Sequence, residues 1–362
     1  MKYTPLALIN VQVVFRKSIY IKDYTAKLVK TLLINGNPKL EEVFSKGKDL
    51  PPKPIHITPL YTTLITKDDS KGINKKKLQE EKKKAIYTKL IPIRSTAKPP
   101  ELNKLKPVKI EAGKKYVFYI GVSMNLLEDV LLGLSCVSRF TFGREVVDVD
   151  HLSYKIRYVN VESESEAIVK KLELAESRTL KVTFMSPTLL KDPLTIMRKK
   201  KKKLFLPLPE AVLATPFLMV LIDKGRLRRS IFLRCMRYIK SVFDIPYTAL
   251  KTVNLVWYVY DNEVLPAIIG YVKYFIDDQV LYHAHSILKM KYRLDFIEAL
   301  SRAIILAQVY GVGDGRATGF GHVSVSLSDG KLMAGNSLPS SPDKTHINPN
   351  QHSINKKQQK EN

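Results

Sequence analysis

The chain has 362 residues, enough for two domains of ordinary size, and 45% of them are hydrophobic. It carries 60 Lys and Arg residues against 34 Asp and Glu, which leaves a formal net charge of +26. This excess argues against a small neutral substrate and favours a polyanion. Because 18 Tyr and 13 Phe offer stacking surfaces, a nucleic acid is favoured over an acidic membrane. Two cysteines, Cys136 and Cys235, are too few for a disulfide framework or a zinc site, and we expect both to be buried thiols.

The chain shows no pattern typical of a signal peptide or a membrane span. Asn10 and Gln12 interrupt the early apolar residues. The longest apolar run, Ala211–Ile222, contains Thr215 and Pro216 and is too short to cross a bilayer. We therefore expect a cytoplasmic protein with no membrane partner.

The first half alternates between two hydrophobic periodicities. A period of two predicts strands over Leu6–Ile21, His56–Thr66, Ala85–Ile93, Lys114–Ser123 and Phe140–Glu162, the last as one or two strands with a bend near His151. Helical spacing predicts helices over Tyr24–Ile34, with Asp23 as N-cap, and over Leu126–Val137. The other segments are expected to be a polar connection at Leu40–Lys53, a solvated insertion at Lys71–Lys84, a loop at Ser95–Lys106, and a linker or helix at Glu162–Glu176.

The second half repeats the order strand–helix–strand–strand–helix–strand. We expect a strand at Thr179–Phe184, a basic amphipathic helix at Arg226–Phe243, a hairpin of Val253–Tyr260 with Ala267–Ile276, a helix near Leu294–Tyr310 and a strand at Val323–Leu327. This order, found twice, predicts an α+β fold of tandem ferredoxin-like (βαββαβ) domains. The predicted boundaries are 1–165, with a Lys-rich insertion near 67–84, and 176–334. We expect residues 335–362 to be a disordered tail.

A glycine-rich segment at 311–321 joins the last predicted helix to the last strand. It holds five glycines in eleven residues, with Arg316 in the middle. One interpretation is a tight connection whose glycines serve only backbone geometry. The other is a loop whose exposed amides approach a phosphodiester, with Arg316 as a forked cation. A dinucleotide fingerprint or an NTPase phosphate loop is excluded, because both follow a strand and open a helix.

This segment resembles the C-terminal signature of the CRISPR precursor-RNA processing endoribonucleases, members of the repeat-associated mysterious protein (RAMP) superfamily. The matching residues are Gly311, Gly313, Arg316, Gly319, Phe320 and Gly321. Leu265–Asp277 and the helix end Ala307–Tyr310 are similar to that family as well. The resemblance implies tandem ferredoxin-like units and cleavage that leaves a 2′,3′-cyclic phosphate and a 5′-hydroxyl. It also implies RNA binding by the loop, at Gly311, Gly313, Gly315, Arg316, Gly319 and Gly321.

Cleavage without a metal needs a base for the 2′-OH, an acid for the leaving 5′-oxygen, and cations for the phosphorane charge. The resemblance implies a His in the loop after the first helix, but Ser45 stands roughly there. His56 is either the acid or base, or a strand histidine that contacts a neighbour. The resemblance also points to Tyr24, Lys27 and Lys30 on the helix and to Lys46 and Lys53 in the loop. These lysines serve catalysis only if burial or nearby cations lower their pKa; otherwise they form a solvated basic face.

Other basic residues are candidates for contacts with the RNA backbone, which give salt-dependent affinity. They are Lys201 in the run Lys199–Lys203, and Arg226, Arg228, Arg229, Arg234 and Arg237 on the helix expected to be the first of the second domain. His283 and His285 are expected in a polar loop, and Trp257 in the core.

The leading hypothesis is a metal-independent, cofactor-free endoribonuclease that processes CRISPR repeat RNA into guide RNAs. Its expected partners are precursor and mature RNA, effector-complex subunits and a second copy of the chain. A non-catalytic RNA-binding subunit of an effector complex is the alternative. A basic structural protein for DNA or a membrane, with a purely geometric glycine segment, is the third hypothesis.

Overall fold

The computed structural model describes residues 3–45, 51–63, 84–93, 98–173, 179–194, 203–246 and 251–328. Every structural statement below concerns these ranges. The Lys-rich insertion up to residue 83, Lys46, Lys201 and the predicted tail at 335–362 lie outside them.

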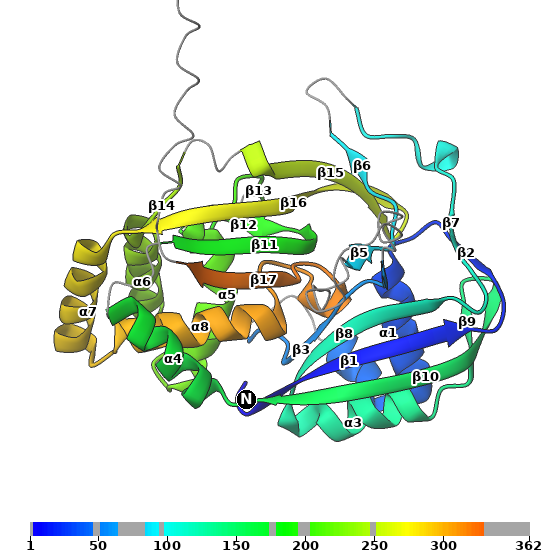
Figure 1. Ribbon diagram of the computed structural model, residues 1–362, viewed down its shortest axis with the longest axis horizontal. Coiled ribbons are helices and arrows are strands. Elements are labelled where there is room, and N and C mark those ends of the chain that lie inside the picture. Colours follow the sequence, from blue (N-terminus) through cyan, green and yellow to red (C-terminus); the bar gives the residue numbers. More distant parts are fainter. Residues whose placement is uncertain are drawn as a thin grey trace, which may run out of the picture. The chain divides into compact units, whose positions relative to one another are not determined.

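The first half contains one antiparallel sheet and four α-helices (Figure 1). Its strands are β1 Leu6–Phe15, β2 Ile19–Ile21, β3 Ile55–Ile57, β4 Tyr61–Thr63, β5 Lys84–Ile86, β6 Ile91–Pro92, β7 Val108–Ile110, β8 Lys115–Ser123, β9 Arg139–Phe142 and β10 Glu145–Val159. Its helices are α1 Thr25–Gly36, α2 Lys39–Ser45, α3 Met124–Ser135 and α4 Val161–Glu173, with a 3₁₀ turn at Leu102–Lys104.

The second half contains a second antiparallel sheet and four more helices. Its strands are β11 Thr179–Thr188, β12 Leu190–Lys191, β13 Lys203–Leu204, β14 Phe243–Asp244, β15 Val253–Tyr260, β16 Glu263–Ile276 and β17 Val323–Ser328. Its helices are α5 Pro209–Asp223, α6 Arg229–Val242, α7 Asp278–Tyr292 and α8 Phe296–Tyr310, and a 3₁₀ turn covers Arg316–Thr318.

The strand order is the same in the central parts of both sheets. The first sheet runs β5-β4-β8-β1-β10-β9, with β3 also paired to β8. The second runs β17-β11-β16-β15-β6, with β14 also paired to β16. In the first sheet β1 lies between β8 and β10, and in the second sheet β11 lies between β16 and β17. The central pairs, β1 with β8 and β11 with β16, are therefore not consecutive in the sequence. Strand β6 comes from the first half and pairs with β15 through Ile91 and Trp257.

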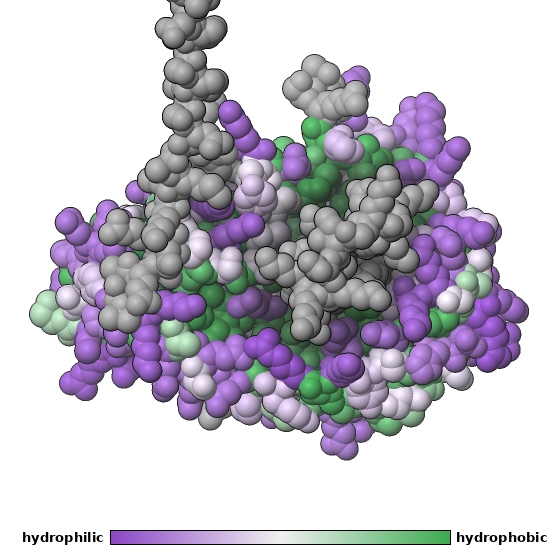
Figure 2. Space-filling view, in the orientation of Figure 1, coloured by the Kyte–Doolittle hydropathy of each residue, from purple (hydrophilic) through white to green (hydrophobic). Residues whose placement is uncertain are grey.

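Each sheet buries one face against helices. Alternate residues of β1 (Ala7, Ile9, Val11 and Val13) share an apolar cluster with Leu28, Leu32 and Leu33 of α1 and Val130 of α3. In the second half, Val182 of β11, Val272 of β16 and Val325 of β17 share a cluster with α5 and α8. Most charged residues lie outside these clusters. In Figure 2, hydrophilic side chains cover much of the rim of the visible face. No helix among the described residues is long and apolar enough to cross a membrane.

Several segments differ from the sequence expectation. The N-cap of α1 is Tyr24 and not Asp23. The predicted polar connection at Leu40–Lys53 contains α2, since Leu40 and Phe44 bury one side of a short helix. The predicted bend in β10 is an irregularity in its pairing with β1 beside His151. Cys136 is exposed, whereas Cys235 is buried as expected.

Two helices of the second half were missed. The apolar run Ala211–Ile222 forms α5, which begins with proline at its first turn and is buried over most of its surface. The helix with the arginines, α6, is therefore the second of this half and not the first. The polar connection expected around His283 and His285 is helix α7, whose first turn is capped by the Asp277 carboxylate accepting from the Val280 amide at 3.0 Å.

Candidate functional site

The glycine-rich segment Gly311–Gly321 turns most of its described backbone amides toward the protein. The Val312 amide donates to the Gly321 carbonyl at 2.8 Å, and the Gly321 amide donates to Pro187 at 3.0 Å. The Asp314 amide donates to Leu189 at 2.9 Å. Among the glycines expected to bind RNA, Gly321 therefore has an amide that is already satisfied inside the fold, and the Gly319 amide donates to the Arg316 carbonyl at 3.3 Å.

The glycines of this segment are required by close packing. A Cβ at Gly319, where φ is +99°, would lie 2.1 Å from the Cβ of Ala26 in α1. At Gly321 it would lie 1.9 Å from the Val312 carbonyl oxygen. The interpretation in which the glycines serve backbone geometry therefore fits the structure.

Arg316 is buried inside the same segment, with 6% of its surface exposed. Its Nη1 donates to the Tyr310 carbonyl at 3.0 Å, and its Nη2 donates to the Lys53 carbonyl at 3.4 Å. Burial lowers the pKa of the guanidinium to about 10, so it remains charged at neutral pH. The Arg316 side chain is therefore engaged with backbone carbonyls and ties the glycine-rich segment to the backbone of Lys53.

Tyr24 lies in an aromatic cluster between α1 and the glycine-rich segment. Its ring stacks on Phe320 at 4.8 Å between centroids and 6° between planes, and Tyr258 packs against Phe320 at 5.0 Å. The Tyr24 hydroxyl donates to the Gly319 carbonyl at 2.8 Å. Tyr24 is fully buried, and burial raises its pKa well above the ordinary value. A catalytic role for Tyr24 is therefore not supported, since the hydroxyl neither ionises readily nor reaches solvent.

His56 is fully buried on β3. Its Nδ1 lies 2.8 Å from the Arg316 carbonyl oxygen, and its ring stacks on His322 at 5.6 Å. Burial, then the neighbouring His322, lowers its pKa well below the usual range, so the ring is neutral near pH 7. Of the two interpretations of His56, the strand histidine that contacts its neighbours fits this geometry, and the acid or base does not.

Lys27 is held by two carboxylates. Its Nζ lies 2.8 Å from Asp23 Oδ2 and 3.0 Å from Oδ1 of Asp261, at the tip of the β15–β16 hairpin that extends toward α1 in Figure 1. Burial lowers its pKa, but the hydrogen bonds to Asp23 and Asp261 outweigh that effect and the pKa is raised overall. Lys27 therefore anchors the hairpin and is a poor proton acceptor.

Lys30 and Lys53, here called the lysine pair, have a different environment. The Lys30 Nζ lies 5.5 Å from the ring centroid of Phe44, and the Lys53 Nζ donates to the Phe44 carbonyl at 2.5 Å. Burial and then Lys27 lower the pKa of Lys30, whereas burial and then Lys30 lower that of Lys53. Neither forms an ion pair with a carboxylate among the residues that the structure describes. These are the conditions that bring a lysine closer to acid–base work.

Sequence reasoning could not find the part that Phe44 plays in this site. Phe44 lies on α2, in a segment that was expected to be a polar connection. The spacing of Leu40 and Phe44 on one helical side was the available signal.

Of the arginines expected to contact the RNA backbone, Arg226 and Arg228 precede α6, Arg229 is its first residue, and Arg234 and Arg237 lie further along it. Arg228 and Arg229 are exposed, and Arg234 is half-buried with its guanidinium carbon 5.9 Å from the ring centroid of Tyr292. The first two are therefore free to meet a phosphate, whereas Arg234 is partly engaged in a cation–π contact.

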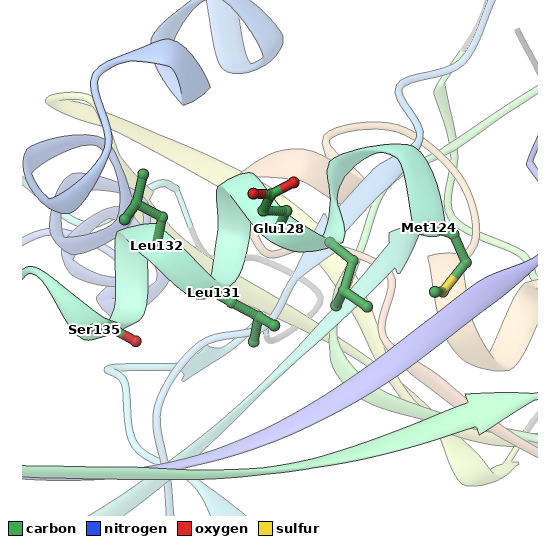
Figure 3. Close-up of a pocket in the computed structure, with 6 residues that line it drawn as sticks. Met124, Glu128, Leu131, Leu132 and Ser135 are labelled. Atoms are coloured by element: carbon green, nitrogen blue, oxygen red, sulfur yellow. The ribbon is translucent and has the colours of Figure 1, made fainter.

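A pocket on α3 lacks the chemistry for RNA cleavage. It is lined by Met124, Leu127, Glu128, Leu131, Leu132 and Ser135, all from one helix, so it is an apolar depression without a cation (Figure 3).

Comparison with solved structures identifies the fold. A Cas6 product complex aligns with 89% of this chain and 100% of its own, at 13% identity and a TM-score of 0.50. Cas6 from Thermus thermophilus aligns with 89% of this chain and 98% of its own, at 14% identity and a TM-score of 0.45. A RAMP protein that binds different RNA substrates aligns at 9% identity and 0.44, over 88% and 99% of the two chains. No family model and no curated protein sequence matches the chain. The chain therefore has a fold like that of the Cas6 product complex, which confirms the resemblance at the level of the fold.

Proposed function

We propose that this protein, which has the fold of Cas6 proteins, is a metal-independent endoribonuclease that cleaves CRISPR repeat RNA into guide RNAs. The observation that carries the proposal is the lysine pair. Lys30 and Lys53 converge on Phe44, both have a lowered pKa, and neither forms an ion pair with a described carboxylate.

The proposed reaction is an attack by the ribose 2′-OH on the adjacent phosphorus. The neutral amine of one lysine accepts the 2′-OH proton, and the ammonium of the other donates a proton to the leaving 5′-oxygen. The positive charge also stabilises the phosphorane. The products are a 2′,3′-cyclic phosphate and a 5′-hydroxyl, and the lysines exchange protonation states. Because the nucleophile belongs to the substrate, in-line positioning supplies much of the rate.

Two ferredoxin-like units, 1–165 and 176–334, are the scaffold of this proposal. The shared strand order supports it. The first sheet has the spatial order β4-β8-β1-β10, and along the chain α1 follows β1 and α3 follows β8. The second has the spatial order β15-β16-β11-β17, and along the chain α5 and α6 come after β11 and α7 and α8 come after β16. These orders support a βαββαβ arrangement in each proposed unit, with one additional helix in each helical connection of the second.

A test uses labelled repeat RNA, protein in stoichiometric excess, and EDTA. We expect a cyclic-phosphate product, and no product when the nucleotide 5′ of the cut carries 2′-deoxyribose, because the nucleophile is then missing. Intact RNA after long incubation would overturn the proposal.

The second candidate function is a non-catalytic RNA-binding subunit of a CRISPR effector complex. The burial of Tyr24 and His56 favours it, since it removes two of the expected acid–base groups. Tight binding of the repeat without cleavage would select this function. Exposed Arg228 and Arg229 support RNA partners in either case.

A further inference from the structure

One face of the second sheet carries mostly exposed or half-buried side chains on strands β11, β16 and β17. Strands β16, β11 and β17 lie side by side, and residues paired across them share a face. Three rows on this face are Tyr271, Thr183 and Ser324; Lys273, Lys181 and Ser326; and Phe275, Thr179 and Ser328. The intervening residues, such as Val182, Val272 and Val325, are in the core against α5 and α8. None of these nine residues is acidic, and the row of Phe275 continues to the exposed carboxylate of Asp244 on β14, at the end of the face.

The rows place two lysines between two aromatic rings. Lys181 and Lys273 are directly opposite each other, an arrangement that destabilises a sheet through like-charge repulsion. Neither forms an ion pair with a described carboxylate. The Lys181 Nζ instead lies 4.6 Å from the ring centroid of Tyr271, a cation–π contact along the diagonal. A polyanion across this row would relieve the repulsion.

The rings are suited to stack on bases. Phe275 is 37% exposed and Tyr271 is half-buried. They are four residues apart on one strand, about 13 Å, so each ring serves a different base. Exposed Ser324 and Ser326 add hydroxyl donors beside them. A membrane would require a broad apolar surface here, whereas alternating rings, ammonium groups and hydroxyls fit a chain of alternating bases and phosphates.

We propose that the open face of β11, β16 and β17 is a second RNA site, which binds single-stranded RNA by stacking bases on Tyr271 and Phe275 and pairing phosphates with Lys181 and Lys273. The Lys181 ammonium leaves the Tyr271 ring for a phosphate as a base takes its place. This surface shares no residue with the lysine pair, so the inference does not depend on cleavage.

The test measures binding of a labelled, unstructured oligouridine of about 12 nucleotides, which spans the usual size of a stacking site. Tyr271→Leu and Phe275→Leu keep apolar bulk but remove the ring, and each should weaken binding about fivefold or more. Lys181→Ala combined with Lys273→Ala should reduce the slope of log affinity against log salt by about 1.4, near 0.7 per phosphate contact. Circular dichroism and thermal unfolding verify that each variant is folded.

Matched controls remove the same residue types from other surfaces. Lys289→Ala with Lys291→Ala changes two exposed lysines in the last turn of α7, and Tyr158→Leu changes a tyrosine that is 64% exposed on β10. Both should bind as the unchanged protein does. If the ring and lysine variants of the open face bind like these controls, the second site is wrong. If they lose oligouridine affinity in a protein that never cleaves repeat RNA, the second site stands and the proposed endoribonuclease falls.

Discussion

The aromatic junction around the glycine-rich segment and the lysine pair lie near one another, yet they differ in what their polar groups contact. In the junction, formed by Tyr24, Phe320 and Gly311–Gly321, the tyrosine hydroxyl and several amides are satisfied by carbonyls of the protein. In the lysine pair, Lys30 has no described acceptor and Lys53 has a single carbonyl. Arg316 connects the two, because its guanidinium reaches both Tyr310 and the Lys53 carbonyl.

This difference separates stability from chemistry. Groups whose hydrogen bonds are complete and buried resist change and offer nothing to a substrate. Cations held near apolar surface without a carboxylate have a lowered pKa and are available to an incoming anion. Substitutions in the junction should therefore change stability, whereas substitutions in the lysine pair should change cleavage.

The largest expected effect is on cleavage. The double variant Lys30→Met with Lys53→Met keeps the apolar stems but removes both amines, and it should lower the single-turnover cleavage rate about 100-fold or more, the usual contribution of acid–base groups. The measurement is product formation with protein in excess over repeat RNA. A rate close to that of the unchanged protein would remove the lysine pair from the mechanism.

The next effect is on folding at Gly319. Gly319→Ala places a Cβ against Ala26 at a positive φ, so backbone strain and overpacking should together cost about 2–4 kcal/mol of unfolding free energy. Denaturant titration measures it. Gly143→Ala is the control, because its φ of +63° is also positive but nothing lies within 4 Å; only strain, about 1 kcal/mol, should remain. Equal losses would show that the contact with α1 is unimportant.

A third effect is the pH dependence of stability. Burial lowers the pKa of His322 from 6.5 to about 4 and that of His56 well below 6.5. The unfolded chain therefore binds protons first, so stability should fall as pH decreases from 6.5 toward 4. Equilibrium unfolding across this range is the measurement. His56→Gln with His322→Gln should flatten the profile, and an unchanged acid slope would show that these rings do not cause it.

The smallest effect concerns Lys27, which lies on the same helix as Lys30 but is paired with Asp23 and Asp261. Lys27→Met should cost at most about 1 kcal/mol in unfolding free energy, as for other partly exposed ion pairs. Cleavage should change little, because Lys27 is committed to the hairpin. A loss of rate as large as that of the double lysine variant would erase the contrast between paired and unpaired lysines.

Local periodicity predicted most of the long elements of the fold. Strands β8, β15 and β17 and helices α1, α3 and α8 lie within a few residues of their expected ranges, because alternation and helical spacing are properties of neighbouring residues. The single strand expected over Leu6–Ile21 is divided into β1 and β2, which belong to different sheets. The missed helices have other patterns. Helix α5 is apolar nearly all round, and α2 and α7 are short or polar enough to resemble connections.

The candidate site was predicted only in part. Lys27, Lys30 and Lys53 were all expected near α1, but their different roles were not separable in sequence. The partners that decide those roles, Asp261 for Lys27 and Phe44 for Lys53, are brought close by folding: the hairpin from the second half reaches α1, and α2 turns Phe44 under the lysines.

By itself, the order of residues determined the cationic character of the chain, the repeated succession of strands and helices, and the position of the glycine-rich turn. These depend on composition and on neighbours a few positions away. Only the tertiary structure decided that Tyr24, His56 and Arg316 are interior residues and that Lys30 and Lys53 lack a carboxylate partner, because burial and ion pairing depend on which distant segments cover a side chain.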